Sequence, residues 1–339
     1  WVQEFSTRSI FTWQKMGLSW LLWHLVTFFC YAGAADSRQK SRSWHVWGTS
    51  SIMRQEAATL SVRASEFRNV LCQGANVRVL VRSNNYRVIQ FQNDNGEWLM
   101  EEGKMRCNED AASCPKREDS PSVAACPRCD CSPIRPIEEF WAPYQSPMLV
   151  KIARHCSGLK EYNLIVVGLG TSSGLQGVAH HCKLGRLGVV EKQQEVVDAA
   201  TKFFGLNASS ISRHAQVLSP YDGTEGLKKL VSDHGQHIYD AVLVDCMMQG
   251  RIPEGCRSPA FFKLLSQSLK SGGLVFQWSL QQDQREVQRE LSSGLGAPVE
   301  IFEQWSTGFQ TGNPASLTML SGSARAVVHS AQVNSQAQT

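Results

Sequence analysis

From residue 164 onward, short apolar runs alternate with segments of helical periodicity. The first run, Leu164-Ile-Val-Val-Gly168, ends in a glycine that precedes a helical segment. Later apolar runs cover residues 187–190, 215–218, 241–244 and 273–277, and the helical segments cover 174–182, 193–204, 226–233 and 259–269. Apolar runs buried on both faces that alternate with helices are typical of parallel sheets with right-handed crossovers. The sequence therefore predicts an α/β domain with a doubly wound, mostly parallel Rossmann-like sheet.

A different pattern precedes this domain. The runs Val77–Arg82 and Tyr86–Phe91 are rich in β-branched residues, and Asn93-Asp-Asn-Gly96 separates the second run from Glu97–Met100. Alternation interrupted by Asn-Gly is the signature of a hairpin, so we expect a small antiparallel β subdomain. The predicted organisation is a leader region at 1–35, a linker at 36–70, a β-rich subdomain at 71–143 with a Cys-rich loop at 107–131, a Rossmann-like domain at 144–323, and a polar tail at 324–339.

The leader region contains an uncharged apolar stretch. Residues 16–35 include no Asp, Glu, Lys or Arg, and the stretch ends in Ala32-Gly-Ala-Ala35. An apolar core before small residues predicts a secretory signal peptide. The alternatives are a membrane anchor, because about 20 apolar residues can span a bilayer and basic residues follow, or an organelle-targeting leader. We expect the chain in the secretory pathway or outside the cell.

Eleven cysteines distinguish the composition, and five of them lie within residues 107–131. That stretch is rich in proline and charge and cannot pack a core by itself. Cys126-Pro-Arg-Cys129 could hold zinc, but the other cysteines are poorly spaced for a second ligand pair. We therefore expect disulfides and no metal. Because five is odd, at least one partner must lie elsewhere.

The first apolar run leads into Gly168-Leu-Gly170-Thr-Ser-Ser-Gly174. Glycines at this position allow backbone amides to approach a ligand, and the helix that follows favours electron-rich groups. The second run ends at Glu191, whose carboxylate can accept hydrogen bonds from ribose hydroxyls. A dinucleotide fingerprint would place glycine where Ser173 stands, so the loop favours an adenosyl cofactor without a pyrophosphate.

Two further acids follow predicted strands. Asp222-Gly223 lies beyond the third strand, where Asp222 could accept the adenine amino group; the alternative is a polar turn residue before a helix. Asp245 ends the fourth strand and should face the same crevice, because ligands in such sheets bind at the carboxyl ends of the strands.

These motifs resemble the class I AdoMet-dependent methyltransferase fold, and within it the spermidine-synthase-like branch. Val167–Gly170, Val190-Glu191, Asp222-Gly223 and Tyr239–Asp245 match the family's glycine loop, ribose-binding acid, adenine-contacting acid and fourth strand. The resemblance implies cofactor contacts at Gly168, Gly170, Gly174, Glu191, Asp222 and Gly223. It implies catalytic or substrate-contacting roles for Asp245 and Tyr144. The implied cofactor is S-adenosylmethionine or its decarboxylated form.

The sequence departs from the family on the acceptor side. Thr171 stands where aminopropyl-transferring members carry an acid in the glycine loop, and Met248 stands where they carry the acid that deprotonates the amine. A thioether cannot act as that base. We therefore favour methyl transfer to an unknown acceptor. The alternatives are an aminopropyltransferase that uses other acids, such as Glu138, Glu139 or Asp245, and a non-catalytic secreted binding module.

The partners follow from this interpretation. A formal charge of +4 with no basic stripe that carries interleaved aromatics indicates no nucleic-acid binding. We expect a small-molecule substrate or a polyamine as the partner. The sequence does not fix the oligomeric state, and a homodimer is one possibility. His180 and His181 are interpreted as surface or packing residues, because no third ligand lies at metal spacing.

Overall fold

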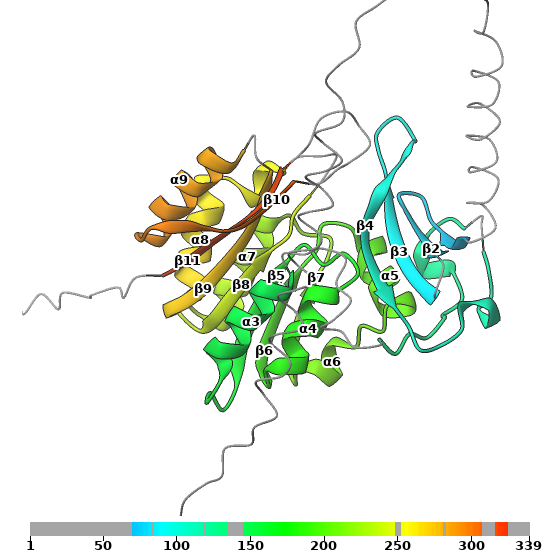
Figure 1. Cartoon of the computed structure of the whole chain (residues 1–339), viewed down its shortest axis with the longest axis horizontal. Helices are drawn as coiled ribbons and strands as arrows, with labels where there is room; N and C mark the ends of the chain where they lie inside the picture. The colour runs from blue at the N-terminus through cyan, green and yellow to red at the C-terminus, as the bar shows by residue number, and fades with distance from the viewer. Residues whose placement is uncertain are drawn as a thin grey trace, which may run out of the picture. The chain divides into compact units, whose positions relative to one another are not determined.

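Two β-sheets form the framework of the computed structural model (Figure 1). The structure describes residues 70–82, 85–117, 120–133, 145–247, 252–280, 283–306 and 316–324. These residues belong to one unit of the chain, Ser61–Thr339. The leader and its candidate anchor at 16–35, most of the linker, Glu138, Glu139, Tyr144, Met248 and the tail after residue 324 lie outside the described residues.

The larger sheet is mostly parallel, as predicted. Its strands are β5 (Tyr162–Val167), β6 (Leu184–Val190), β7 (His214–Leu218), β8 (Tyr239–Val244), β9 (Leu269–Leu280), β10 (Val299–Ser306) and β11 (Ser316–Ser323). Their order is β10-β11-β9-β8-β5-β6-β7, with β11 antiparallel to both of its neighbours. The chain winds outward from β5 to β7 and then restarts on the other side of β5 with β8. This reversal creates the switch point at which ligands bind in open α/β sheets.

Helices cover both faces of this sheet. They are α3 (Gln145–Cys156), α4 (Ser173–His181), α5 (Gln194–Phe203), α6 (Ala208–Ile211), α7 (Gly223–His234), α8 (Pro259–Ser268) and α9 (Gln284–Leu295). Alternate residues of β5 point to opposite cores. Leu164 and Val166 pack with α3, α4 and α5, whereas Ile165 and Val167 pack with α7, α8 and α9. The predicted doubly wound α/β fold is confirmed.

The smaller sheet is antiparallel, in the order β1 (Val70–Gln73), β2 (Val77–Arg82), β3 (Tyr86–Gln92) and β4 (Trp98–Arg106). The predicted hairpin between β3 and β4 is present. Asn93 Oδ1 accepts hydrogen bonds from the amides of Asn95 and Glu97, and Gly96 adopts a φ of +79°. Strand β1 was not predicted, and its first residue, Val70, lies within the segment expected to be linker.

The small sheet shares a core with one face of the large sheet. Leu71, Val79 and Ile89 belong to the same apolar cluster as the buried residues of α4 and α5. Glu195 at the start of α5 accepts hydrogen bonds from the backbone amides of Ala75 and Asn76 in the β1–β2 turn. The small sheet is therefore packed directly against α4, which follows the glycine loop, and against α5, which follows β6.

Disulfides staple the Cys-rich segment, as expected. Three bonds, Cys72–Cys126, Cys107–Cys131 and Cys114–Cys129, join it to β1 and to itself. Cys72 is thus the outside partner that the odd number of cysteines required. Two more bonds, Cys156–Cys182 and Cys246–Cys256, lie in the Rossmann-like domain. These bonds are consistent with an oxidising secretory or extracellular environment. None of the described helices is long and apolar enough to cross a membrane.

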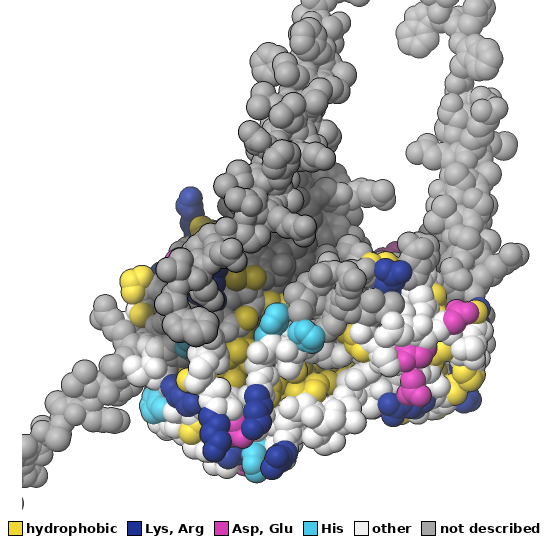
Figure 2. Space-filling model, turned by 60° about the horizontal axis from the view of Figure 1, so that its bottom comes forward, with side chains coloured by type: hydrophobic (Ala, Val, Ile, Leu, Met, Phe, Trp, Pro, Cys, Tyr) yellow, Lys and Arg dark blue, Asp and Glu magenta, His cyan; other side chains and the backbone are white. Residues whose placement is uncertain are grey.

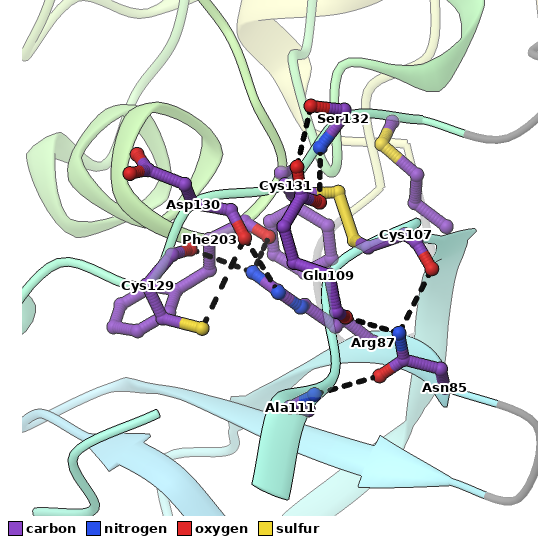
Figure 3. Close-up of a disulfide and its surroundings, with 12 residues drawn as sticks. Asn85, Arg87, Cys107, Glu109, Ala111, Cys129, Asp130, Cys131, Ser132 and Phe203 are labelled. Carbon is purple, nitrogen blue, oxygen red and sulfur yellow. Dashed lines mark hydrogen bonds between the residues drawn. A yellow bond between two sulfur atoms is a disulfide. The ribbon is translucent and has the colours of Figure 1, made fainter. Parts of the chain in front are cut away.

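Arg87 of β3 anchors this segment from within (Figure 3). Its side chain is fully buried, and its guanidinium donates to the carbonyls of Cys129, Asp130 and Phe203 at 2.6, 2.6 and 2.9 Å. Burial lowers the pKa of Arg87, while nearby Glu109 and Asp130 oppose that shift. Because Phe203 ends α5, one side chain connects the small sheet, the Cys-rich segment and the Rossmann-like domain.

The disulfides lead to a direct prediction. We expect mass spectrometry of the non-reduced, alkylated protein to find all ten cysteines from Cys72 to Cys256 unmodified and paired as above. Unfolding after reduction should need less denaturant. Each disulfide restricts the unfolded chain and thereby stabilises the folded state by about 2–4 kcal/mol. Free thiols within residues 107–131, or bound zinc, would contradict this pairing.

Candidate adenosyl-cofactor site

A glycine loop connects β5 to α4 at the switch point of the large sheet. Gly168 adopts a φ of +85°, and a Cβ atom there would overlap the carbonyl of Asp245 at the end of β8. Only glycine fits this conformation without strain. The close approach brings the end of β8 against the loop.

Gly170 has a different environment. Its φ is +50°, and a Cβ atom placed on it would meet no heavy atom within 4 Å. Packing therefore does not require glycine here, although the positive φ favours it. The missing side chain leaves an open position above the backbone of the loop. Gly174 lies in the first turn of α4 and is partly buried.

Glu191 follows β6 and faces the loop. One carboxylate oxygen accepts a hydrogen bond from the amide of Leu169 at 2.8 Å, and the other accepts from the amide of Gln193 at 2.9 Å. The side chain is only 9% exposed. Burial raises the pKa of Glu191, and the backbone hydrogen bonds oppose that shift. A carboxylate offers about four acceptor positions, so capacity remains for a further donor.

Hydrogen bonds between strand ends place these residues in a row. The amide of Asp245 donates to Val167, that of Gly168 donates to Val190, and that of Glu191 donates to Leu218, at 2.8, 2.9 and 3.0 Å. The row therefore crosses four neighbouring strand ends, which are spaced about 4.8 Å apart. The structure brings Asp245, Gly168 and Glu191 together, as expected from the topology.

Asp222 lies at the next strand end and caps α7. Its Oδ1 accepts from the amide of Glu225 at 2.9 Å, which is the bond expected of an N-cap residue. A Cβ on the following Gly223 would press against the carbonyl of Gly255 and the Sγ of Cys256. The polar-turn role weighed for Asp222 is therefore present, and its second Oδ atom is not needed by that cap.

The disulfide Cys246–Cys256 was missed as a feature of the site. Cys246 directly follows Asp245, and Cys256 packs against Gly223 at the start of α7. The bond thus lies between Asp245, which was expected to be catalytic, and Gly223, which was expected to contact the cofactor. The signal in the sequence was that Cys246 follows the end of the predicted fourth strand and that a second cysteine stands ten residues later.

Thr171 is buried, 3% exposed, and its hydroxyl donates to Ser173 Oγ at 3.3 Å. A Cβ on Gly103 of β4 would overlap the Thr171 side chain, so the small sheet packs directly on this position. Gln176 fixes the neighbouring Ser172 through a hydrogen bond of 2.8 Å. The glycine loop is therefore held by β4 and α4 as well as by Glu191.

Asp245 is the acid that the structure describes after β8, and its side chain is exposed. Tyr144, the other residue expected to contact substrate, lies outside the described residues. Within the described ranges, no group of three or more His, Cys, Asp or Glu side chains is arranged to hold a metal ion.

Comparison with known proteins concerns the fold. No protein-family model matches the sequence, and no curated protein is similar to it in sequence. The structure is similar to spermidine synthases and class I methyltransferases. A probable spermidine synthase from Corynebacterium glutamicum matches with a TM-score of 0.49 and 15% identity, over 73% of this chain and 76% of that chain.

Two further solved structures are similar. The spermidine synthase from Thermotoga maritima has a TM-score of 0.48 and 12% identity, over 76% of this chain and 74% of its own. Human methyltransferase-like protein 13, solved in complex with SAH, has a TM-score of 0.40 and 19% identity, over 52% of this chain and 81% of its own. At these identities the likeness describes the fold alone.

Proposed function

We propose that the crevice at Gly168–Gly174 binds an adenosyl cofactor and that the chain is an AdoMet-dependent transferase. The observation that carries this proposal is the open position at Gly170 beside the buried carboxylate of Glu191. A ligand can approach the backbone amides there without meeting a side chain. A buried carboxylate next to such a loop suits a ligand that presents vicinal hydroxyls.

The described residues fit the nucleoside part of such a cofactor. Glu191 would accept hydrogen bonds from the ribose hydroxyls, since the amides of Leu169 and Gln193 leave acceptor capacity. Gly168, Gly170 and Gly174 would admit the cofactor to the start of α4. Asp222 would accept a hydrogen bond from the adenine amino group. Gly223, which has no side chain, allows Cys256 to pack closely against the start of α7 beside Asp222.

The reaction we favour is methyl transfer to an unknown small-molecule acceptor. When bound, S-adenosylmethionine supplies a methyl group on a sulfonium that needs no activation by the protein. The protein contributes proximity and orientation. Asp245, exposed at the end of β8, would hold the acceptor or accept its proton, and Tyr144 would contact the substrate.

The runner-up reaction is aminopropyl transfer from decarboxylated S-adenosylmethionine. An amine acceptor must lose a proton, so this reaction needs acids for binding and for proton transfer. Thr171 carries no charge and is covered by the small sheet at Gly103. Thr171 therefore cannot supply the charge that aminopropyl transfer needs, and its placement favours methyl transfer. A non-catalytic secreted binding module is the third candidate, and the five disulfides favour an extracellular role of that kind.

An assay with both cofactor forms distinguishes these candidates. We expect no spermidine from decarboxylated S-adenosylmethionine and putrescine, and transfer of radiolabelled methyl groups from S-adenosylmethionine to a member of a broad acceptor panel. Asp245→Asn should lower that transfer by about 10²-fold or more if the carboxylate accepts a proton. Formation of spermidine that Asp245→Asn abolishes would establish the runner-up instead. Cofactor binding without turnover would indicate the binding module.

We propose that the chain enters the secretory pathway and that residues 16–35 act as a cleaved signal peptide. The disulfides support an oxidising compartment. A membrane anchor over the same residues and a homodimer stay as alternatives that sequencing of the mature amino terminus and light scattering would test.

A further inference from the structure

A row of basic residues follows the edge of the large sheet that lies opposite to the cofactor crevice. Lys183 directly precedes β6, Arg213 directly precedes β7, and Lys160 stands two residues before β5. The three strands are neighbours and run in parallel, so their amino ends meet at one edge. Strand spacing of about 4.8 Å sets the steps between these positions.

Two more basic residues extend the row. Arg154 lies in the last turn of α3, and the disulfide Cys156–Cys182 ties the end of that helix to the end of α4, directly before Lys183. Arg186 lies in β6, in register with His214 of β7. We call Arg154, Lys160, Lys183, Arg186 and Arg213 the amino-edge row; four of these side chains are exposed, and Arg186 is partly exposed.

The positive charge of the row is largely uncompensated. Within the described residues, Arg154, Lys160, Arg186 and Arg213 form no hydrogen bond or ion pair through their side chains. Lys183 pairs with Glu161 at 3.7 Å, and both side chains are exposed, so this contact contributes little. Nearby Asp233 and Asp240 are already paired with Lys229 and Lys270.

Figure 2 shows this face of the molecule from below. Lys and Arg side chains gather there in one group, with His side chains beside them and little acidic surface among them. The exposed large apolar side chains of the described residues are Val150, Leu159 and Ile301, none of which is aromatic. The face therefore offers cations and imidazole rings, but no exposed Phe, Tyr or Trp among the described side chains.

We propose that the amino-edge row binds a sulfated polysaccharide. The negative charges of a linear polyanion repeat along its length. They can therefore pair with the cations that stand before the neighbouring strands β5, β6 and β7. None of the described Phe, Tyr or Trp side chains is exposed, which disfavours single-stranded nucleic acid, because such ligands are bound largely by base stacking on these rings. Five disulfides favour a compartment in which polysaccharides rather than nucleic acids are the common polyanions.

Binding to heparin tests the proposal. The wild-type chain should bind immobilised heparin at about 0.15 M salt and should not bind desulfated heparin of the same length. The variant Lys160→Gln, Lys183→Gln, Arg213→Gln should bind at least about tenfold more weakly. Its slope of log Kd against log salt should fall by about 3, since each lost contact contributes about one.

A matched triple variant controls for net charge. Lys228→Gln, Lys263→Gln, Arg285→Gln removes the same charge from exposed positions on α7, α8 and α9 and should bind heparin like the wild type. Equal weakening in both triple variants, or no binding by the wild type, would overturn the proposal. Tighter binding of a single-stranded oligonucleotide than of heparin would assign the row to nucleic acid and also overturn it. Circular dichroism should show that both variants fold.

Discussion

Replacing Arg87 with methionine should destabilise the fold by about 3–5 kcal/mol. The substitution removes a buried guanidinium and leaves the carbonyls of Cys129, Asp130 and Phe203 without their donor. Hydrogen bonds to charged groups contribute about 1.5–3 kcal/mol each, and part of the loss is offset because the charge no longer has to be buried. For a domain of this size the midpoint of thermal unfolding should fall by about 10 °C.

Arg128→Met is the matched control for this prediction. Arg128 lies in the same Cys-rich segment, but its ion pair with Asp130 is exposed on both sides. Such a substitution should change the free energy of unfolding by less than about 0.5 kcal/mol. Denaturant unfolding of both oxidised variants, followed by tryptophan fluorescence, provides the comparison. Equal stability of the two variants would show that the buried guanidinium does not hold the three parts of the fold together.

The second large effect concerns the proposed cofactor. Glu191→Ala should weaken binding of S-adenosylmethionine by about 1–3 kcal/mol, which is roughly a 5- to 150-fold increase in Kd. The variant loses the acceptor for the ribose hydroxyls and also releases the amide of Leu169 that the carboxylate holds at 2.8 Å. Glu191→Gln keeps the volume and one acceptor oxygen, so its Kd should fall between those of the wild type and Glu191→Ala.

Two other variants separate a binding effect from a structural one. Asp198→Ala removes a carboxylate from the outer side of α5, where it contacts Gln194, and should leave the Kd unchanged. Gly170→Ala adds a methyl group in an open position at a positive φ. It should cost about 1 kcal/mol of stability and weaken cofactor binding more than that strain explains. Unchanged cofactor affinity in both Gly170→Ala and Glu191→Ala would argue against this site.

The regular part of the fold could be predicted because burial leaves a simple pattern. Strands such as β5 and β8 are covered on both faces, so they read as continuous apolar runs, and a glycine marks the turn after β5. Topology then requires Gly168, Glu191 and Asp245 to meet at one edge, before any contact is known.

Other features depend on contacts that local patterns do not encode. Strand β1 has only four residues, and the pairing of Cys72 with Cys126 joins positions 54 residues apart. Thr171 could be noted as a departure from the family's acid, but its burial under Gly103 required the packing of the small sheet. The amino-edge row could not be predicted from local sequence patterns. Its members are separated along the chain by the helices of the βα repeat and come together only where the strands begin.

Calorimetric titration of the mature, oxidised protein with S-adenosylmethionine tests the central claim most directly. The account predicts saturable binding at one site, competition by decarboxylated S-adenosylmethionine and by methylthioadenosine, little or no binding of NAD, and a Kd that rises roughly 5- to 150-fold in Glu191→Ala. Absence of binding by every adenosyl compound, or binding that Glu191→Ala leaves unchanged, would contradict the account.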